Sequence, residues 1–236
     1  MESVPYGPAG RMRRGGIALN EARQAATIRR SEAEKPLFLT ELHMSNLVVC
    51  TNLTLDGVMQ APGRPDEDTR DGFTHGGGGA RYAAMAQAGE VFANAGALLL
   101  GRRTYQDFFN TWPNRLDSPF TPWLNDIRKY VASTTLKEPL PWVNSMLLKG
   151  DVGKAIATLK RELEKDVLIL GSGELVRSLM RDDVIDEWVL LIHPLVLGSG
   201  HRLLASDSPY TALSLVNSTA TQDGVLVATY HPAATR

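Results

Sequence analysis

The chain is poor in cysteine, in excess charge and in long apolar runs, and each lack excludes a class of protein. Cys50 is the only cysteine among 236 residues, so one chain builds neither a disulfide framework nor a cysteine-based zinc site. The 25 basic and 26 acidic residues leave a net charge of −1, which offers no basic field to a nucleic-acid backbone. No apolar run is long enough to span a membrane, and no secretory signal follows the N-terminal arginines. We therefore expect a cytoplasmic protein with no metal, nucleic-acid partner or membrane anchor.

Residues 1–43 differ from the remainder in composition and in pattern. They are rich in Arg, Glu, Ala and Gly, show no strand pattern, and lack an apolar face wide enough to demand burial. Met44 then opens MSNLVVCTNLTLDG, which has the pattern expected at the start of a domain. We expect 1–43 to be a disordered extension rather than a functional arm, and 44–236 to form one domain.

From Met44 onward, strand-like and helix-like segments alternate. Strand-like runs cover residues 47–52, 97–101, 129–134, 146–150, 167–171, 186–198, 212–221 and 225–231, and helical patterns cover 80–96, 103–112, 151–166 and 174–182. Strands joined by helices indicate a parallel sheet, whereas the last two strands form an expected antiparallel hairpin through Gly224. The predicted fold is therefore α/β, with a mostly parallel central sheet and an antiparallel C-terminal edge hairpin.

A basic segment follows one of these strands, at the edge of the sheet where open α/β folds bind their ligands. In LLLGRRTYQDF, a buried strand ends at Gly101, and Arg102, Arg103 and Thr104 open a helix. Two arginines and a hydroxyl at a helix N-terminus suit a bound phosphate, but they equally suit a solvated basic turn.

A glycine turn between a strand and a helix occurs in VLILGSGELVRSL. Gly171 and Gly173 let backbone amides approach a diphosphate, and the helix N-terminus adds partial positive charge. The turn lacks the third glycine of G-x-G-x-x-G, and Glu174 adds a negative charge, so the fingerprint is weak. A further polar segment, YVASTT, ends another strand with the hydroxyls of Ser133 and Thr134.

Taken in order, five segments resemble the dihydrofolate reductase-like superfamily. They are TLDGVM (54–59), LLLGRRTYQDF (98–108), YVASTT (130–135), VLILGSGELVRSLM (167–180) and IDEWVLLIHPLVLGSGHRLL (185–204). The most similar branch is the reductase domain that forms the C-terminal half of the bifunctional riboflavin-biosynthesis deaminase-reductase. The resemblance covers about residues 44–232. It implies a three-layer fold, hydride transfer from NADPH to a small heteroaromatic or sugar-imine substrate, and a homodimer.

The resemblance also implies roles for individual residues. Gly101, Arg102, Arg103 and Thr104 match the segment that holds the 2′-phosphate of NADPH, and Ser133 and Thr134 match the strand end that lines the adenosine half. Gly171, Ser172, Gly173, Glu174 and Leu175 match the turn under the diphosphate, and Thr54, Asp56 and Gly57 match the loop beside the nicotinamide. The paired arginines favour NADPH over NADH, because the extra phosphate needs a cation. Asp56 is the expected polar partner of the substrate.

Three histidines require separate consideration. His75 lies in a glycine-rich loop where similar family members often have HGGW, so it either faces the substrate or is an ordinary polar loop residue. A proton for the reaction can come from Asp56, from His75 or from water. We expect His193, before Pro194, to be a hydrogen-bonded structural residue and His201 to be exposed.

The sequence departs from the family on the substrate side. The helical segment between Ala80 and Gln87 has no carboxylate, unlike a true dihydrofolate reductase, which argues against folate reduction. Leu170 stands where riboflavin-pathway reductases usually have an acidic residue, and no zinc-deaminase half is present. Gly78 stands where relatives commonly have Trp, which predicts a wider substrate mouth. An alternative is therefore a non-catalytic nucleotide-binding protein with a degenerate substrate side.

Overall fold

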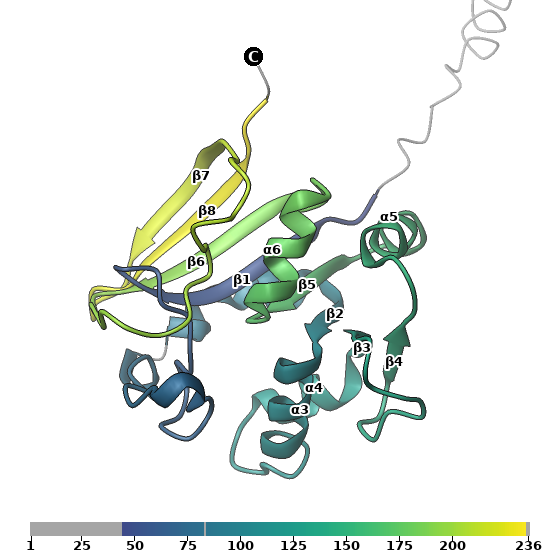
Figure 1. Cartoon of the computed structure of the whole chain (residues 1–236), viewed down its shortest axis with the longest axis horizontal. Coiled ribbons are helices and arrows are strands. Elements are labelled where there is room, and N and C mark those ends of the chain that lie inside the picture. Colours follow the sequence, from purple (N-terminus) through teal and green to yellow (C-terminus); the bar gives the residue numbers. More distant parts are fainter. Residues whose placement is uncertain (1–43, 83, 235–236) are drawn as a thin grey trace, which may run out of the picture. The chain divides into compact units, whose positions relative to one another are not determined.

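A sheet of eight strands, in the order β4-β3-β2-β5-β1-β6-β8-β7, organises the described part of the chain (Figure 1). The computed structural model describes residues 44–82 and 84–234, so the expected extension 1–43 lies outside the described residues. The strands are β1 (Leu47–Thr54), β2 (Ala95–Gly101), β3 (Arg128–Ala132), β4 (Ser145–Leu148), β5 (Asp166–Leu170), β6 (Glu187–His193), β7 (Leu213–Ala220) and β8 (Leu226–Pro232). The α-helices are α2 (Gly89–Asn94), α3 (Arg102–Thr111), α4 (Phe120–Asp126), α5 (Val152–Glu162) and α6 (Gly173–Arg181), and the 3-10 helices are η1 (Arg70–Gly72), η2 (Ala80–Tyr82) and η3 (Ala84–Ala88).

Strand β1 occupies an interior position, and its pairing sets the direction of its neighbours. It runs parallel to β5 on one side and to β6 on the other. The pairs β2–β5, β2–β3 and β3–β4 are also parallel. Strand β8 is antiparallel to both β6 and β7. These pairings confirm the predicted α/β fold, with its mostly parallel central sheet and antiparallel C-terminal edge hairpin.

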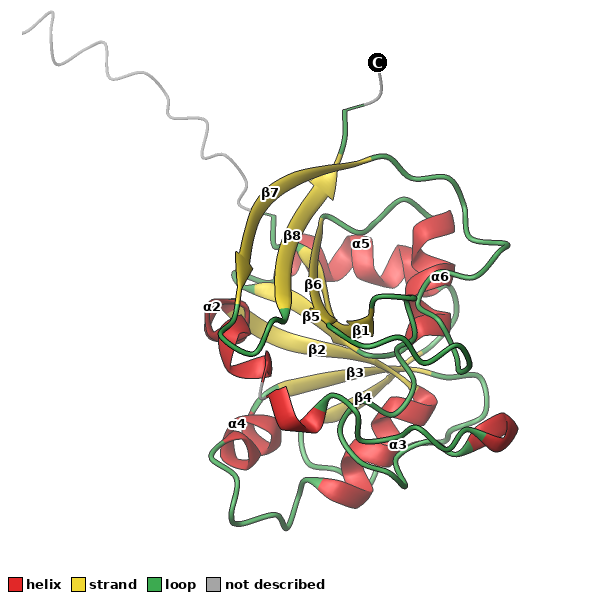
Figure 2. Cartoon of the chain, turned by 90° about the vertical axis from the view of Figure 1, so that its left-hand side faces the viewer, coloured by secondary structure: helices red, strands yellow, loops and turns green. Residues whose placement is uncertain are grey.

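Apolar side chains alternate between the two faces of the sheet and build two cores. On β1, Val48 and Cys50 belong to one core, and Leu47 and Val49 belong to the other. Helices α2, α3 and α4 pack on the first core, and α5 and α6 pack on the second, which gives three layers (Figure 2). Burial raises the pKa of the Cys50 thiol to about 12, so this cysteine behaves as the small buried hydrophobe that the sequence predicts.

The helix expected over 80–96 is shorter and less regular than its pattern suggests. The 3-10 helices η2 and η3 precede α2, and Ala95 already belongs to β2 because it pairs with Asp166 of β5. Helix α4 is not predicted, since Pro122 interrupts its pattern. A proline is tolerated in the first turn of a helix, where backbone N–H groups have no intrahelical partner.

A buried lysine closes the C-terminal end of α4. The Lys129 side chain is 0% exposed, and its Nζ donates to the carbonyl oxygens of Leu124 at 2.6 Å and of Ile127 at 2.7 Å. The ammonium also lies 4.6 Å from the centre of the Trp142 ring. Burial lowers its pKa to about 8, which is still above neutral pH, so the group remains charged and keeps its donors. Lys129 therefore fixes α4, which contributes one wall of the cleft described below.

We predict that Lys129→Met lowers the free energy of unfolding by about 1–3 kcal/mol, because it leaves carbonyl oxygens at the end of α4 without a donor. Urea unfolding at pH 7 measures the change. The matched control is Lys137→Met, because Lys137 is exposed. Equal stability of the two variants would show that the buried ammonium does not hold α4.

Candidate functional site

Polar segments end or follow four parallel strands that are neighbours in the sheet. In the order β3-β2-β5-β1, these segments are 133–134, 101–104, 171–175 and 54–57. Parallel pairing places the carboxyl ends of all four strands at the same edge, where open α/β sheets bind ligands. These four polar segments, which are far apart in the sequence, therefore lie along one edge of the sheet.

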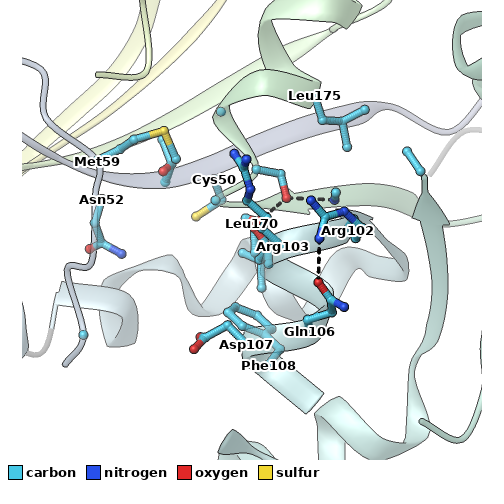
Figure 3. Close-up of a pocket in the computed structure, with 18 of the residues that line it drawn as sticks. Cys50, Asn52, Met59, Arg102, Arg103, Gln106, Asp107, Phe108, Leu170 and Leu175 are labelled. Carbon is cyan, nitrogen blue, oxygen red and sulfur yellow. Dashed lines mark hydrogen bonds between the residues drawn. The ribbon is translucent and has the colours of Figure 1, made fainter. Parts of the chain in front are cut away.

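A cleft of about 2300 Å³ includes this edge and extends to the starts of β2 and β3, where Ala95 and Arg128 also line it (Figure 3). Eleven predicted cofactor-binding residues line it: Gly101, Arg102, Arg103, Thr104, Ser133, Thr134, Gly171, Ser172, Gly173, Glu174 and Leu175. The remaining predicted site residues, Thr54, Asp56, Gly57 and His75, do not line this cleft. The structure thus brings together eleven of the thirteen predicted cofactor-binding residues. It does not bring Thr54 and Gly57, or the predicted catalytic residues Asp56 and His75, to this cleft.

The N-termini of α3 and α6 open into the cleft without a capping side chain. Helix α3 follows Gly101 and α6 follows Ser172, and neither residue caps its helix through a side chain among the described residues. The Ser172 hydroxyl instead accepts from the Gly101 backbone N–H at 3.0 Å and donates to the Leu170 carbonyl at 3.2 Å. The first N–H groups of both helices and the helix dipoles are therefore available to an anion.

Two guanidinium groups lie beside these helix ends. Arg103 Nη1 is 3.5 Å from Glu174 Oε1, which joins α3 to α6, and Arg102 Nη1 donates to Gln106 Oε1 at 3.0 Å. Both contacts are exposed and therefore weak, so a phosphate can compete for the arginines. Glu174 opposes an anion, and Arg103 offsets part of its charge. Two uncapped helix N-termini and two arginines fit the phosphate groups of a dinucleotide.

The two glycines of the turn after β5 differ in conformation and surroundings. Gly171 has a φ of +60°, in the left-handed region, and it is followed by Ser172 with a φ of 56°. At Gly173, a Cβ would lie only 2.5 Å from the Met59 sulfur. The turn is therefore both tightly wound and in close contact with the loop after β1.

Asp56 lies in an environment that differs from the one expected for a proton donor. Its carboxylate accepts from the Thr54 hydroxyl at 2.5 Å and from the backbone N–H groups of Leu197 at 3.2 Å and Gly198 at 2.8 Å. Arg202 Nη2 lies 3.7 Å away. The hydrogen bond from Thr54 and the two from the backbone hold the Asp56 pKa well below its usual value, at about 2. The geometry favours a carboxylate that ties two loops together.

His75 and the first three glycines of the run 76–79 lie outside the cleft, whereas Gly79 lines it. His75 is exposed, with its ring 5.8 Å from that of Phe73, and it lines a separate cavity of only about 20 Å³. A Cβ at Gly76 would lie 2.7 Å from the Pro65 carbonyl oxygen, and a Cβ at Gly78 would lie 3.3 Å from Leu195. The wider mouth predicted at Gly78 is therefore not observed, because the glycines allow close packing instead.

The cleft also contains residues that the sequence patterns do not single out. Arg64 Nη2 and Asp107 Oδ1 form an ion pair of 2.7 Å between the loop after β1 and helix α3. Asn52 lines the cleft from β1 and bonds to buried His193. An aromatic wall from α2, α3 and α4, with the segment after α3, consists of Phe92, Phe108, Trp112, Phe120 and Trp123. Strand alternation, which places Asn52 on the same face as Cys50, is the one signal that identifies any of these residues from sequence.

Neither a metal-ligand cluster nor a membrane-spanning helix is found in the described part of the chain. Within residues 44–82 and 84–234, no group of three His, Cys, Asp or Glu side chains is placed to hold a metal ion. Within the same residues, no helix is both long and apolar enough to cross a bilayer.

Comparison with protein families and curated proteins gives relatives without an assigned activity. Residues 46–227 match the model of the family described as RibD C-terminal domain. The uncharacterized protein YyaP of Bacillus subtilis (strain 168) is 27% identical over 139 residues, which is 57% of this chain and 72% of that protein. The uncharacterized protein YwjB of the same organism is 41% identical over 59 residues, which is 25% of this chain and 34% of that protein.

Solved structures share the fold at low sequence identity. A putative riboflavin biosynthesis protein from Shewanella sp. PV-4 has a TM-score of 0.58 at 22% identity, over 81% of this chain and all of that one. A diaminohydroxyphosphoribosylaminopyrimidine deaminase/5-amino-6-(5-phosphoribosylamino)uracil reductase from Thermotoga maritima has a TM-score of 0.54 at 17% identity, over 80% of this chain and 57% of that one. A dihydrofolate reductase from Enterococcus faecalis complexed with NADP(H) has a TM-score of 0.50 at 14% identity, over 79% of this chain and 96% of that one. The predicted resemblance is confirmed: the chain belongs to the RibD C-terminal domain family.

Proposed function

We propose that this protein is an NADPH-dependent reductase that transfers hydride to a C=N or C=O group of a small heteroaromatic or sugar-imine substrate. The family-level activity is that of a 5-amino-6-(5-phosphoribosylamino)uracil reductase of riboflavin biosynthesis. The observation that carries the proposal is the meeting of two uncapped helix N-termini and two arginines at one edge of the cleft. This donor set suits the three phosphate groups that NADPH carries.

We infer the direction of the bound cofactor from the order of the strands. Ser133 and Thr134 on β3 would line the adenosine, 101–104 on β2 would hold the 2′-phosphate, and 171–175 on β5 would hold the diphosphate. The next strand in this order is β1, so the nicotinamide end would lie beside Asn52 and Met59. When bound there, NADPH supplies the hydride.

The protein would contribute positioning and an apolar surface. Phe92, Phe108, Trp112, Phe120 and Trp123 form an aromatic wall on one side of the cleft, which offers apolar contact to a bound ring. Such a site favours catalysis by holding a flat substrate against the nicotinamide in one orientation. The Arg64–Asp107 ion pair adds two charged groups to the same cleft, besides Arg102, Arg103 and Glu174.

We predict that Arg102→Ala and Arg103→Ala each raise the Kd for NADPH by about tenfold or more while leaving the Kd for NADH nearly unchanged, because each removes a cation from the 2′-phosphate. Titration by tryptophan fluorescence measures both constants. Arg161→Ala is the control, because Arg161 is exposed on α5 and does not line the cleft. Equal losses for NADPH and NADH would contradict the assignment of these arginines to the 2′-phosphate.

Oxidation of NADPH with aminouracil, pterin and quinone substrates tests the catalytic part of the proposal. Tight NADPH binding with no oxidation across this panel would instead favour the alternative, a non-catalytic nucleotide-binding protein.

Under this proposal, Asp56 connects the loops 54–57 and 195–202 and stabilises both. Because the Asp56 pKa is lowered on folding, the ionised carboxylate adds to the free energy of unfolding. This contribution is fully present above about pH 4 and is lost as the pH falls toward 2. A carboxylate with so low a pKa is deprotonated at neutral pH and is a poor proton donor there.

We predict that Asp56→Ala lowers the free energy of unfolding at pH 7 by roughly 1–3 kcal/mol, because it removes several charge-assisted hydrogen bonds. The difference from the wild type should narrow between pH 4 and pH 2 in urea titrations. The exposed Glu164→Ala is the control. Loss of turnover at unchanged stability would contradict the anchoring role and assign Asp56 to the chemistry.

A second copy of the chain is the partner that we propose for the β7–β8 face, in a cytoplasmic homodimer. All eight residues of β7 are exposed, and the strand pairs with β8 on one side only. Leu215 and Val216 are 56% and 54% exposed, and Leu213 and Leu226 lie in the same hairpin. An exposed apolar edge of this kind favours association with another strand edge or sheet face.

We predict that Leu215→Asp converts a dimer into a monomer, because a charge on this face opposes its burial. Light scattering coupled to size-exclusion chromatography measures the mass. The control is Leu116→Asp, at a leucine that is 93% exposed in the segment between α3 and α4. A wild-type monomer, or a dimer that survives Leu215→Asp, would contradict the assignment.

A further inference from the structure

Asn52 and His193 form a hydrogen-bonded pair beneath the cleft. They lie on β1 and β6, which are adjacent and parallel, and His193 ends β6. Asn52 Oδ1 is 2.9 Å from His193 Nε2. His193 is only 2% exposed, whereas Asn52 lines the cleft. The pair therefore connects a buried imidazole with a side chain that a ligand can reach.

The surroundings of His193 determine which nitrogen carries the proton. Burial lowers the His193 pKa, so the ring is neutral and has one N–H group. Among the described residues, Nδ1 is buried without a hydrogen-bond partner. A proton on Nδ1 would leave a buried donor unpaired, whereas a proton on Nε2 donates to the Asn52 oxygen and leaves only an acceptor unpaired. Orphaned buried donors are rarer than under-satisfied acceptors, so the Nε2–H form is favoured.

This tautomer fixes the orientation of the Asn52 amide. Because the His193 Nε2–H group donates to Asn52 Oδ1, the Asn52 amide nitrogen points away from His193. This nitrogen lies 3.3 Å from the Met85 sulfur. Sulfur is a weak acceptor, so a ligand oxygen or ring nitrogen offers a better partner. Met85 packs against the same core, next to the cleft that it also lines. The fixed amide therefore presents an N–H donor to the cleft.

The position of Asn52 is where a substrate is expected. In Figure 3, the Asn52 side chain projects from β1 on the side of the cleft opposite Arg102, and the Asp107 carboxylate points toward that same side. Under the proposed function, this β1 side receives the nicotinamide end of the cofactor. A donor at this place would meet the substrate rather than the phosphates.

We propose that Asn52 is a substrate-binding residue whose amide N–H donates to a carbonyl oxygen or imine-type ring nitrogen, and that His193 is the positioning residue that fixes this amide. The inference rests on the proposed function. It narrows the substrate to heteroaromatic compounds that present a hydrogen-bond acceptor to Asn52 on β1.

Calorimetric titration of 5,6-diaminouracil into the full chain saturated with NADPH tests the proposal. Asn52→Leu keeps the side-chain volume but removes the donor, and His193→Phe keeps a ring beside Tyr82 but removes the Nε2–H group. We expect each to raise the Kd for 5,6-diaminouracil about tenfold, the effect of one lost hydrogen bond. His193→Gln, whose amide replaces the Nε2–H donor, should stay within about twofold of the wild type. His231→Phe, at an exposed histidine bonded to Glu187, should change nothing.

Nitrogen-15 NMR of the histidine rings gives an independent readout, and we expect the wild type to carry the His193 proton on Nε2. If His193→Phe fails to fold, the Kd values of Asn52→Leu and His193→Gln test the proposal without it. A proton on Nδ1, or an unchanged Kd in Asn52→Leu, overturns the proposal. So does a wild type that binds NADPH but not 5,6-diaminouracil. Failure to bind NADPH overturns the proposed function itself, and the inference falls with it.

Discussion

Parallel pairing of β1 with β5 and β6 is the constraint on which the rest of the structure depends. These strands are buried on both faces, so their apolar side chains hold both cores together. Because parallel strands share a direction, each strand end must lie at the same edge as the ends of its neighbours. The cleft, the helix N-termini and Asn52 all follow from this one arrangement.

At that edge, the Ser172 hydroxyl joins two of the segments that line the cleft. Its hydrogen bond from the Gly101 backbone N–H links the turn after β5 to the end of β2. Since this hydroxyl is engaged there, it does not cap α6, and the first N–H groups of that helix are left for a ligand. Charge at the same place is balanced rather than strongly positive, because Glu174 pairs with Arg103. Under the proposed function, such balance suits reversible binding of the cofactor.

Much of the fold is predictable from sequence because its signals are local. Continuous apolar runs such as 167–171 identify strands buried on both faces, and Gly224 marks the closing hairpin. The glycine turn and the paired arginines also carry local signals, and the structure brings them into one cleft. Helix α4 is an exception, because the carbonyl oxygens at its C-terminal end are bound by Lys129 of β3, a contact that no pattern within 120–126 shows.

The substrate side is less predictable because it depends on contacts between distant segments. The partners of the Asp56 carboxylate include Gly198, 142 positions away, and no local pattern shows that bond. The glycine run appears flexible in sequence, yet Gly76 packs against Pro65 in a contact that leaves no room for a side chain. The Asn52–His193 bond likewise joins residues 141 positions apart. The first two contacts change the role that sequence alone suggests, whereas the third agrees with the hydrogen-bonded structural His193 that the sequence predicts.

A crystal structure of the protein with bound NADPH tests the central claim most directly. The account predicts the 2′-phosphate against Arg102 or Arg103, the diphosphate at the turn formed by Gly171, Ser172 and Gly173, and the nicotinamide on the β1 side of the cleft. A diphosphate bound away from the N-termini of both α3 and α6 would contradict it.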